Sequence, residues 1–216
     1  LQLNGIMEIL EIQELYASRK FSLLVAECRK RIEGNPVDGG YWHFLALGLF
    51  HLGQIDQSLE AFEHGLDKHP EFIPLYRDLT AVLLFASKKA EAFDSIEKAL
   101  AREPENPLLW VDKGAVLRHL GYHRSAKKSY YHALVLDSNC QEACINLGNL
   151  LVDENSFFEA ERMYLRAAQI NPDHQTAWYH AGRSCLFRND YITAFRYLKN
   201  ANYHKAGDYD TLLLLA

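Results

Sequence analysis

The sequence predicts an all-α fold, a solenoid of stacked helical hairpins, and three observations predict it. In the sequence of 216 residues, Pro36 and Pro70 are 34 residues apart, and so are Pro70 and Pro104. Pro172 lies twice that distance beyond Pro104. Small and large apolar residues recur at the same step, which we call the repeat length. Within each unit the apolar residues follow the period of a helix.

The repeat length divides most of the chain into six units with no insertion or deletion. One small position is occupied by Ser58, Ala92, Ala126, Ala160 and Ala194. One large position is occupied by Phe62, Ile96, Tyr130, Tyr164 and Leu198. We expect one domain over 1–216 with repeats 5–38, 39–72, 73–106, 107–140, 141–174 and 175–208, and 209–216 starting a capping or seventh-repeat helix.

Each unit is predicted to form two helices. In the fourth unit, apolar residues at helical spacing predict a first helix over 108–120 and a second over 125–136. Gly121 marks the turn between them, and residues that favour turns occupy the equivalent positions: Gly53, Ser87, Asn155 and Asn189. Neither helix can bury its apolar stripe alone, so we expect neighbouring hairpins to stack.

The pattern is similar to that of the tetratricopeptide repeat (TPR) family. The residues that carry the resemblance are Cys144, Leu147, Gly148, Phe157, Ala160, Tyr164, Ala167 and Pro172, and Trp178, Ala181, Gly182, Tyr191, Ala194, Leu198 and Ala201. The resemblance implies a right-handed superhelix whose first helices line a concave groove that binds a peptide or a protein, with no catalytic residue in the repeat. The first unit departs from the pattern, with Leu24 and Arg31 at small positions, as is expected of an end repeat.

The resemblance also implies which residues face the groove, since four positions of each first helix point inwards in such a stack. Several of these residues are apolar, aromatic or arginine, a composition typical of recognition surfaces. Simple solvent exposure of individual members stays an alternative. The predicted groove residues are His43, Leu47, Phe50, Arg77, Leu84, Val111, Arg118, Ile145, Asn149, Tyr179 and Arg183.

Three arginines in this set, Arg77, Arg118 and Arg183, indicate a ligand with an acidic side chain or a C-terminal carboxylate. The sign of the groove depends on the tilt of the first helices. A small change of tilt would add three aspartates to the groove and remove the excess of positive charge: Asp78, Asp112 and Asp153.

Composition excludes several classes of protein. A net charge of −5 argues against non-specific binding to nucleic acid, which requires clustered positive charge. No apolar stretch approaches the ~20 residues that cross a bilayer, so we expect no membrane insertion. Four cysteines without framework spacing favour a reducing compartment, and with no signal-peptide pattern at the first residues we expect a cytoplasmic protein.

No catalytic motif, cofactor site or metal site is predicted. His119 and His123 lie on both sides of the turn at Gly121, and Cys144 fills a core position, so neither the histidine pair nor the cysteines resemble a tetrahedral zinc site. We therefore expect a protein-interaction scaffold that is not an enzyme. Two alternatives remain open: a substrate-recruiting arm of a larger enzyme such as a glycosyltransferase, and an assembly subunit that self-associates through exposed ends.

Overall fold

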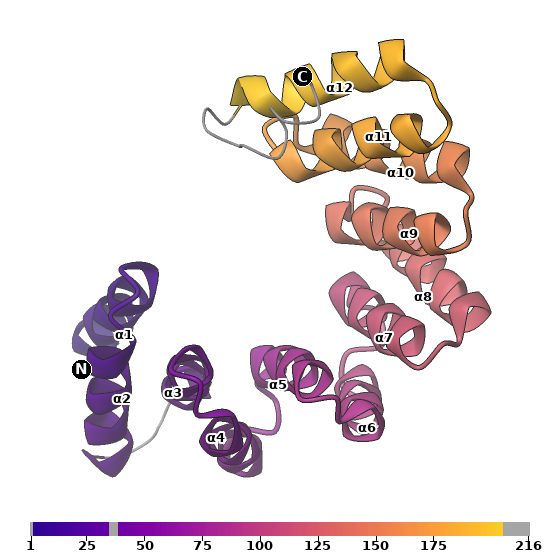
Figure 1. Ribbon diagram of the computed structural model, residues 1–216. Coiled ribbons are helices and arrows are strands. Elements are labelled where there is room, and N and C mark those ends of the chain that lie inside the picture. Colours follow the sequence, from indigo (N-terminus) through magenta and orange to yellow (C-terminus); the bar gives the residue numbers. More distant parts are fainter. Residues whose placement is uncertain (1, 35–38, 205–216) are drawn as a thin grey trace. The chain divides into compact units, whose positions relative to one another are not determined.

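The protein is described by a computed structural model that covers the backbone of residues 2–34 and 39–204 and the side chains of 9–33 and 39–201. These residues form twelve α-helices and no strand (Figure 1), which confirms the predicted all-α fold. The helices are α1 (Gln2–Ala17), α2 (Phe21–Gly34), α3 (Gly39–His51), α4 (Ile55–Lys68), α5 (Ile73–Phe85), α6 (Lys89–Leu100), α7 (Pro107–His119), α8 (His123–Leu136), α9 (Gln141–Asp153), α10 (Phe157–Ile170), α11 (Gln175–Phe187) and α12 (Tyr191–His204).

The helices divide into two compact units, Leu1–Pro104 with α1 to α6 and Glu105–Ala216 with α7 to α12. Each unit holds three hairpins. From the second hairpin on, each falls within one of the predicted repeats, whereas α1 begins before the first, at Gln2. The odd-numbered helices are the first helices of their hairpins and the even-numbered ones the second. Neighbouring first helices also contact each other directly, as α3 does α5 and α7 does α9, and we call the surface formed by their side chains the inner face.

Every hairpin turn uses a left-handed residue. Gly53 and Gly121 have φ of 77° and 83°, and the other predicted turn residues, Ser87, Asn155 and Asn189, have φ between 58° and 61°. The following residue donates its backbone N–H to a carbonyl five positions back, which caps the open end of the first helix. The turn between α1 and α2 has the same geometry. Its left-handed residue is Arg19, at φ 55°, which was not predicted from the sequence as a turn residue.

The core depends on the close approach of the two helices in each hairpin. Ala92, Ala126 and Ala160 are fully buried, and so are the large side chains Phe62 and Ile96. In the fourth and fifth repeats the tyrosine ring at the large position lies directly over a glycine of the first helix. A Cβ atom at Gly148 would lie 2.7 Å from Cε1 of Tyr164, and one at Gly114 would overlap Tyr130 even more closely.

The first hairpin accommodates its unusual residues in two ways. Leu24 is fully buried, and its side chain with that of Val25 packs against Gly48 of the next hairpin. Arg31 keeps its charge by pairing with Glu11 at 2.7 Å and Glu27 at 3.0 Å. A small position thus becomes a polar cluster in the end repeat.

Local hydrogen bonds fix two of the connections between hairpins. Asn106 accepts a hydrogen bond from the backbone N–H of Leu108 at 3.0 Å, and Pro107 occupies the first turn of α7. Asp137 accepts from the backbone N–H of Asn139 at 2.9 Å, in the connection of the fourth repeat that lacks a proline. Pro36, one of the prolines that mark the repeat, and the predicted helix start at 209–216 lie outside the described residues.

The four cysteines are free and buried. Burial raises the pKa of Cys28 and of Cys185 to about 12, and it also raises that of Cys144. A thiol that stays protonated is a poor nucleophile. These cysteines therefore behave as small core side chains.

The glycine–tyrosine contact predicts the effect of adding one methyl group. Gly114→Ala should lower the free energy of unfolding by about 1–3 kcal/mol, because the new Cβ overlaps the Tyr130 ring. Adding Tyr130→Ile, the residue that the third repeat has at this position, should recover part of that loss. Urea unfolding of the two single variants and the double variant measures the coupling, and losses that simply add would contradict the contact.

The buried cysteines predict slow thiol chemistry. In the folded protein at pH 7.5, a disulfide reagent should modify Cys28, Cys144 and Cys185 much more slowly than free cysteine, since each has a raised pKa. In denaturant the same thiols should react at once. Rapid reaction without denaturant would show that the hairpins open readily.

Candidate functional site

A pocket of about 120 Å³ opens on the inner face of the second unit. It lies where α7, α9 and α11 follow one another, with α10 contributing its base. Three of the predicted groove residues lie in it together, one from each first helix. Its lining residues are Arg118, Asn149, Val152, Asp153, Tyr164, His180, Arg183, Ser184 and Phe187.

Arg118 already has a partner at the edge of this pocket. Its Nε lies 2.6 Å from Oδ2 of Asp153, and this ion pair joins α7 to α9. The hydrogen bond to Asp153 raises the pKa of the guanidinium further. Asp153 is one of the aspartates that a change of helix tilt was expected to bring into the groove, so the positive charge of Arg118 is balanced here.

Arg183 is the second cation of the pocket, and among the described side chains no carboxylate forms an ion pair with it. It is exposed, and its guanidinium lies 5.7 Å from the ring centre of Tyr179 and 5.8 Å from that of Phe187. Such cation–π contacts orient a guanidinium without using its N–H groups. Its donors therefore stay available to a ligand.

The base of the pocket is polar, and its side chains contact one another. The Tyr164 hydroxyl donates a hydrogen bond to Oδ1 of Asn149 at 2.7 Å, and the Tyr164 ring stacks on His180 with the ring centres 5.2 Å apart. Burial raises the pKa of Tyr164, so its hydroxyl stays protonated. Burial also lowers the pKa of His180 below the ordinary 6.5, and the charges of Arg183 and His174 act in the same direction. His180 is therefore neutral at pH 7, and the lining carries a net charge of +1 from Arg118, Asp153 and Arg183.

The first unit holds five more of the predicted groove residues. Nε2 of His43 on α3 lies 2.5 Å from Oδ2 of Asp78 on α5, the same kind of link between first helices as the pair in the second unit. Phe50 meets Phe85 edge to face at 5.2 Å. Leu47, Arg77 and Leu84 are half-buried on the same two helices.

One predicted groove residue is not accessible. Val111 is 1% exposed, because it packs into the core of the second unit and presents no surface to a ligand. Ile145 and Tyr179 are half-buried on α9 and α11.

Sequence reasoning missed the polar base of the pocket. Tyr164 was assigned to the core, which is where its ring lies, but its hydroxyl reaches through to Asn149. His180 and Phe187 occupy positions next to the four inward-facing ones. The available signal was Asn149 itself, since a buried tyrosine hydroxyl needs a partner and only an inward polar residue can provide one.

Two kinds of feature are absent from the described part of the chain. In 2–34 and 39–204 no helix is both long and apolar enough to cross a bilayer. Within the same ranges, no three histidine, cysteine, aspartate or glutamate side chains gather as metal ligands would.

Hairpins of two helices that recur at a constant repeat length define a helical-repeat protein. Residues 141–174, the fifth hairpin, match the tetratricopeptide repeat family. This match and the repeated hairpins support the predicted tetratricopeptide repeat family.

Two solved structures and one relative place the chain among known proteins. The structure of PilW, a type IV pilus biogenesis factor, superposes with a TM-score of 0.80 over all of both chains at 14% identity. That of YrrB, a TPR protein with an unusual peptide-binding site, has a TM-score of 0.55 at 25% identity and covers 86% of this chain and 95% of that one. Protein O-mannosyl-transferase TMTC1 of Mus musculus is 30% identical over 133 residues, which are 60% of this chain and only 14% of that protein.

The half-buried, neutral His180 predicts a pH dependence of stability. In the unfolded chain a histidine takes up its proton near pH 6.5, whereas the folded protein resists protonation to lower pH. The free energy of unfolding should therefore fall as the pH drops below 6.5, until the lowered pKa of the folded state is reached. Denaturant unfolding between pH 7.5 and 5 should show a shallower fall for His180→Gln than for the wild type, and an equal fall would contradict the burial of this ring.

Proposed function

We propose that the chain is a non-catalytic scaffold that binds a peptide or protein partner along its inner face. The observation that carries the proposal is the pocket lined by Arg118, Asn149 and Arg183, where inward side chains of three successive first helices meet. Side chains from successive repeats suit an extended ligand, which can contact one repeat after another. The likeness to YrrB, whose structure is described by its peptide-binding site, is consistent with this use of the fold.

The proposed ligand carries a carboxylate, either an acidic side chain or a free C-terminus. Arg183 is held by two aromatic rings and has N–H donors to offer, and a guanidinium binds a carboxylate through two parallel hydrogen bonds. The neutral amide of Asn149 beside it can add a donor. Exposed aromatic side chains nearby, such as Phe187, supply apolar contact.

Binding of a fluorescent peptide rich in aspartate and glutamate, with a free C-terminus, tests this ligand. Arg183→Ala should weaken binding at least about tenfold, because hydrogen bonds to charged groups contribute ~1.5–3 kcal/mol. The Arg77, Arg118 and Arg183 triple alanine variant should weaken it further. Fluorescence anisotropy titrations provide the dissociation constants.

The matched control is Arg162→Ala, since Arg162 is also an exposed arginine but lies on the second helix α10. Its variant should bind the acidic peptide as the wild type does. Equal binding by the wild type and the triple variant would contradict the acidic ligand. In that case capture of partners by the wild type and by a Phe50, Arg118 and Tyr179 triple alanine variant would show whether the inner face binds at all.

A second candidate function is that of a recruiting arm within a larger enzyme. The observation that favours it is the 30% identity to the O-mannosyl-transferase TMTC1, of which the chain matches only 14%. The full reading frame tests it: a βα pattern typical of a glycosyltransferase beyond residue 216 would support the arm, and further repeats of the same length would support the scaffold.

We also propose a place in the cell and a class of partner. Four free cysteines favour a reducing compartment, and we propose the cytoplasm, which imaging of a tagged chain tests. The acidic balance of the sequence, −5, favours protein partners over nucleic acid. Self-association through the ends of the repeat array is a further mode, and light scattering over a range of concentrations measures it.

A further inference from the structure

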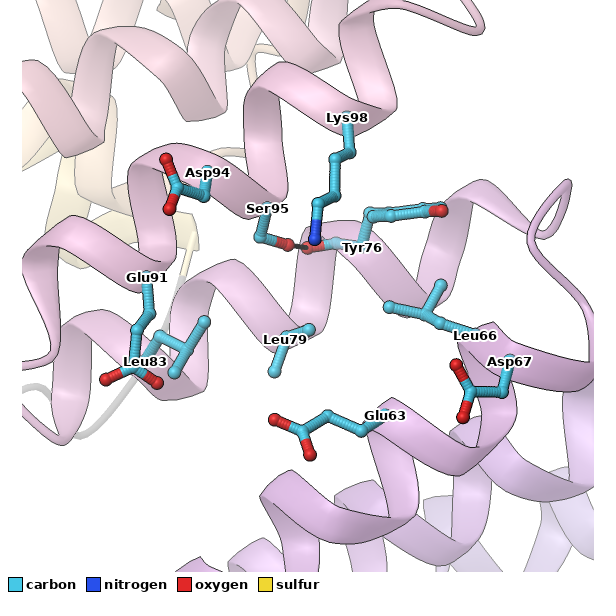
Figure 2. A pocket seen from close by; sticks show the side chains of 10 residues that line it. All are labelled: Glu63, Leu66, Asp67, Tyr76, Leu79, Leu83, Glu91, Asp94, Ser95 and Lys98. Carbon is cyan, nitrogen blue, oxygen red and sulfur yellow. Dashed lines mark hydrogen bonds between the residues drawn. The ribbon is translucent and has the colours of Figure 1, made fainter.

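A second cleft lies in the first unit. It has a volume of about 270 Å³ and lies between the second helices α4 and α6, over the side of α5. Its lining residues are Glu63, Leu66, Asp67, Tyr76, Leu79, Leu83, Glu91, Asp94, Ser95 and Lys98 (Figure 2).

The floor of the cleft is apolar. Leu79 and Leu83 of α5 lie between the two walls in Figure 2, and Leu66 of α4 continues the apolar surface. Leu79 and Leu83 are 7% and 4% exposed, so the little surface they leave open faces this cleft. An apolar floor under a polar edge is typical of sites that receive an apolar side chain.

One small residue keeps the cleft open. Ser95 lies on the wall from α6, and its hydroxyl donates only a long hydrogen bond, 3.5 Å, to the Tyr76 carbonyl. The equivalent positions hold the small residues Ala61 and Ser129 in α4 and α8, and the longer side chains Met163 and Tyr197 in α10 and α12. The chain itself therefore shows which residue would fill the space.

The edge of the cleft is acidic. Glu63 and Asp67 lie on the α4 wall, and Glu91 and Asp94 on the α6 wall, with Lys98 as the one base among the lining residues. Glu91 pairs with Lys88 at 3.5 Å, whereas no described cation pairs with the other three. Four carboxylates against one ammonium give the lining a net charge of −3.

We propose that this cleft docks a short segment of a partner protein in which a large apolar residue is flanked by lysine or arginine. The apolar side chain enters over Leu79 and Leu83, and the flanking cations face Glu63 and Asp67 on one wall and Asp94 on the other. The argument for this occupant is complementarity of charge on both sides of an apolar floor. The volume is just below the ~300–1,000 Å³ of sites for drug-sized molecules, which suits a side chain better than a cofactor.

This docking surface is distinct from the proposed inner-face site. It lies between second helices of the first unit, whereas Arg118, Asn149 and Arg183 belong to first helices of the second. The ligands are of opposite charge, since the inner pocket suits a carboxylate and this cleft suits cations. Failure of one proposal therefore leaves the other in place.

Fluorescence anisotropy with three capped peptides of equal length tests the proposal. The first has leucines flanked by lysine and arginine, the second has glutamate in place of the basic residues, and the third has serine in place of the leucines. The wild type should bind the first peptide at least about tenfold more tightly than either of the others. Raising the salt from 50 to 500 mM should weaken this binding, since the charges at the edge are exposed.

One variant fills the apolar cleft, and a second variant neutralises its acidic edge. Ser95→Met places the residue of the fifth repeat in the cleft and should abolish binding without a loss of thermal stability. Glu63→Gln, Asp67→Asn and Asp94→Asn together should weaken binding about tenfold, since three exposed charge pairs with the peptide are lost. These three side chains are exposed, so this variant keeps the test valid even if Ser95→Met fails to fold.

Glu159→Gln, which removes an exposed carboxylate of α10 that lines neither pocket, is the matched control and should bind the basic peptide as the wild type does. Equal binding by the wild type and the charge variant, no preference for the basic peptide, or no binding at millimolar concentrations would overturn the proposal. Sedimentation of the protein alone covers the other occupant. If the wild type dimerises and Ser95→Met is monomeric, the cleft receives a second copy, and the proposal of a partner segment is wrong.

Discussion

The whole arrangement depends on how closely two helices of one hairpin can approach. Gly114 under Tyr130 and Gly148 under Tyr164 show the limit, since a single methyl group has no room at either contact. A close pair of helices leaves an apolar stripe on each side, and only another hairpin of the same geometry can cover it. The constant repeat length therefore follows from packing, because a residue inserted in one hairpin would rotate its stripe away from the next.

The same constraint explains how much of the fold could be predicted. Helix ends, turn positions and core residues repeat with the packing, so Gly121 and Asn155 could be assigned to left-handed turns from spacing alone. Arg19 could not, because in an end repeat the turn geometry persists while the residue type varies. The candidate site was predicted less completely. Spacing gives the direction of a side chain, and Arg118 and Arg183 do line one pocket, but it does not give partners such as Asp153 or a hydroxyl that crosses from the second helix, as that of Tyr164 does.

The two candidate surfaces depend on residues whose identity the packing of the core does not determine. Val111 is a residue that the packing does determine. It occupies a position that was expected to face the groove, but it is buried in the core. Ser95 shows the opposite case, a position where longer side chains stand in α10 and α12 and where a short one leaves the cleft between α4 and α6 open. The two candidate surfaces thus arise from substitutions within a uniform scaffold. Because the two surfaces have opposite charges, they suit two ligands of opposite charge.

The polar links between first helices share one spacing. Tyr16 to His51, His43 to Asp78 and Arg118 to Asp153 each join residues 35 positions apart, one repeat length plus one. A carboxylate that approaches Arg118 therefore meets an internal competitor already in place. Replacing the Asp153 carboxylate by a ligand carboxylate yields little net binding energy. A small anion is therefore disfavoured, whereas a ligand that also gains from neighbouring contacts can bind. The internal pair would then act as a filter on what the arginine accepts.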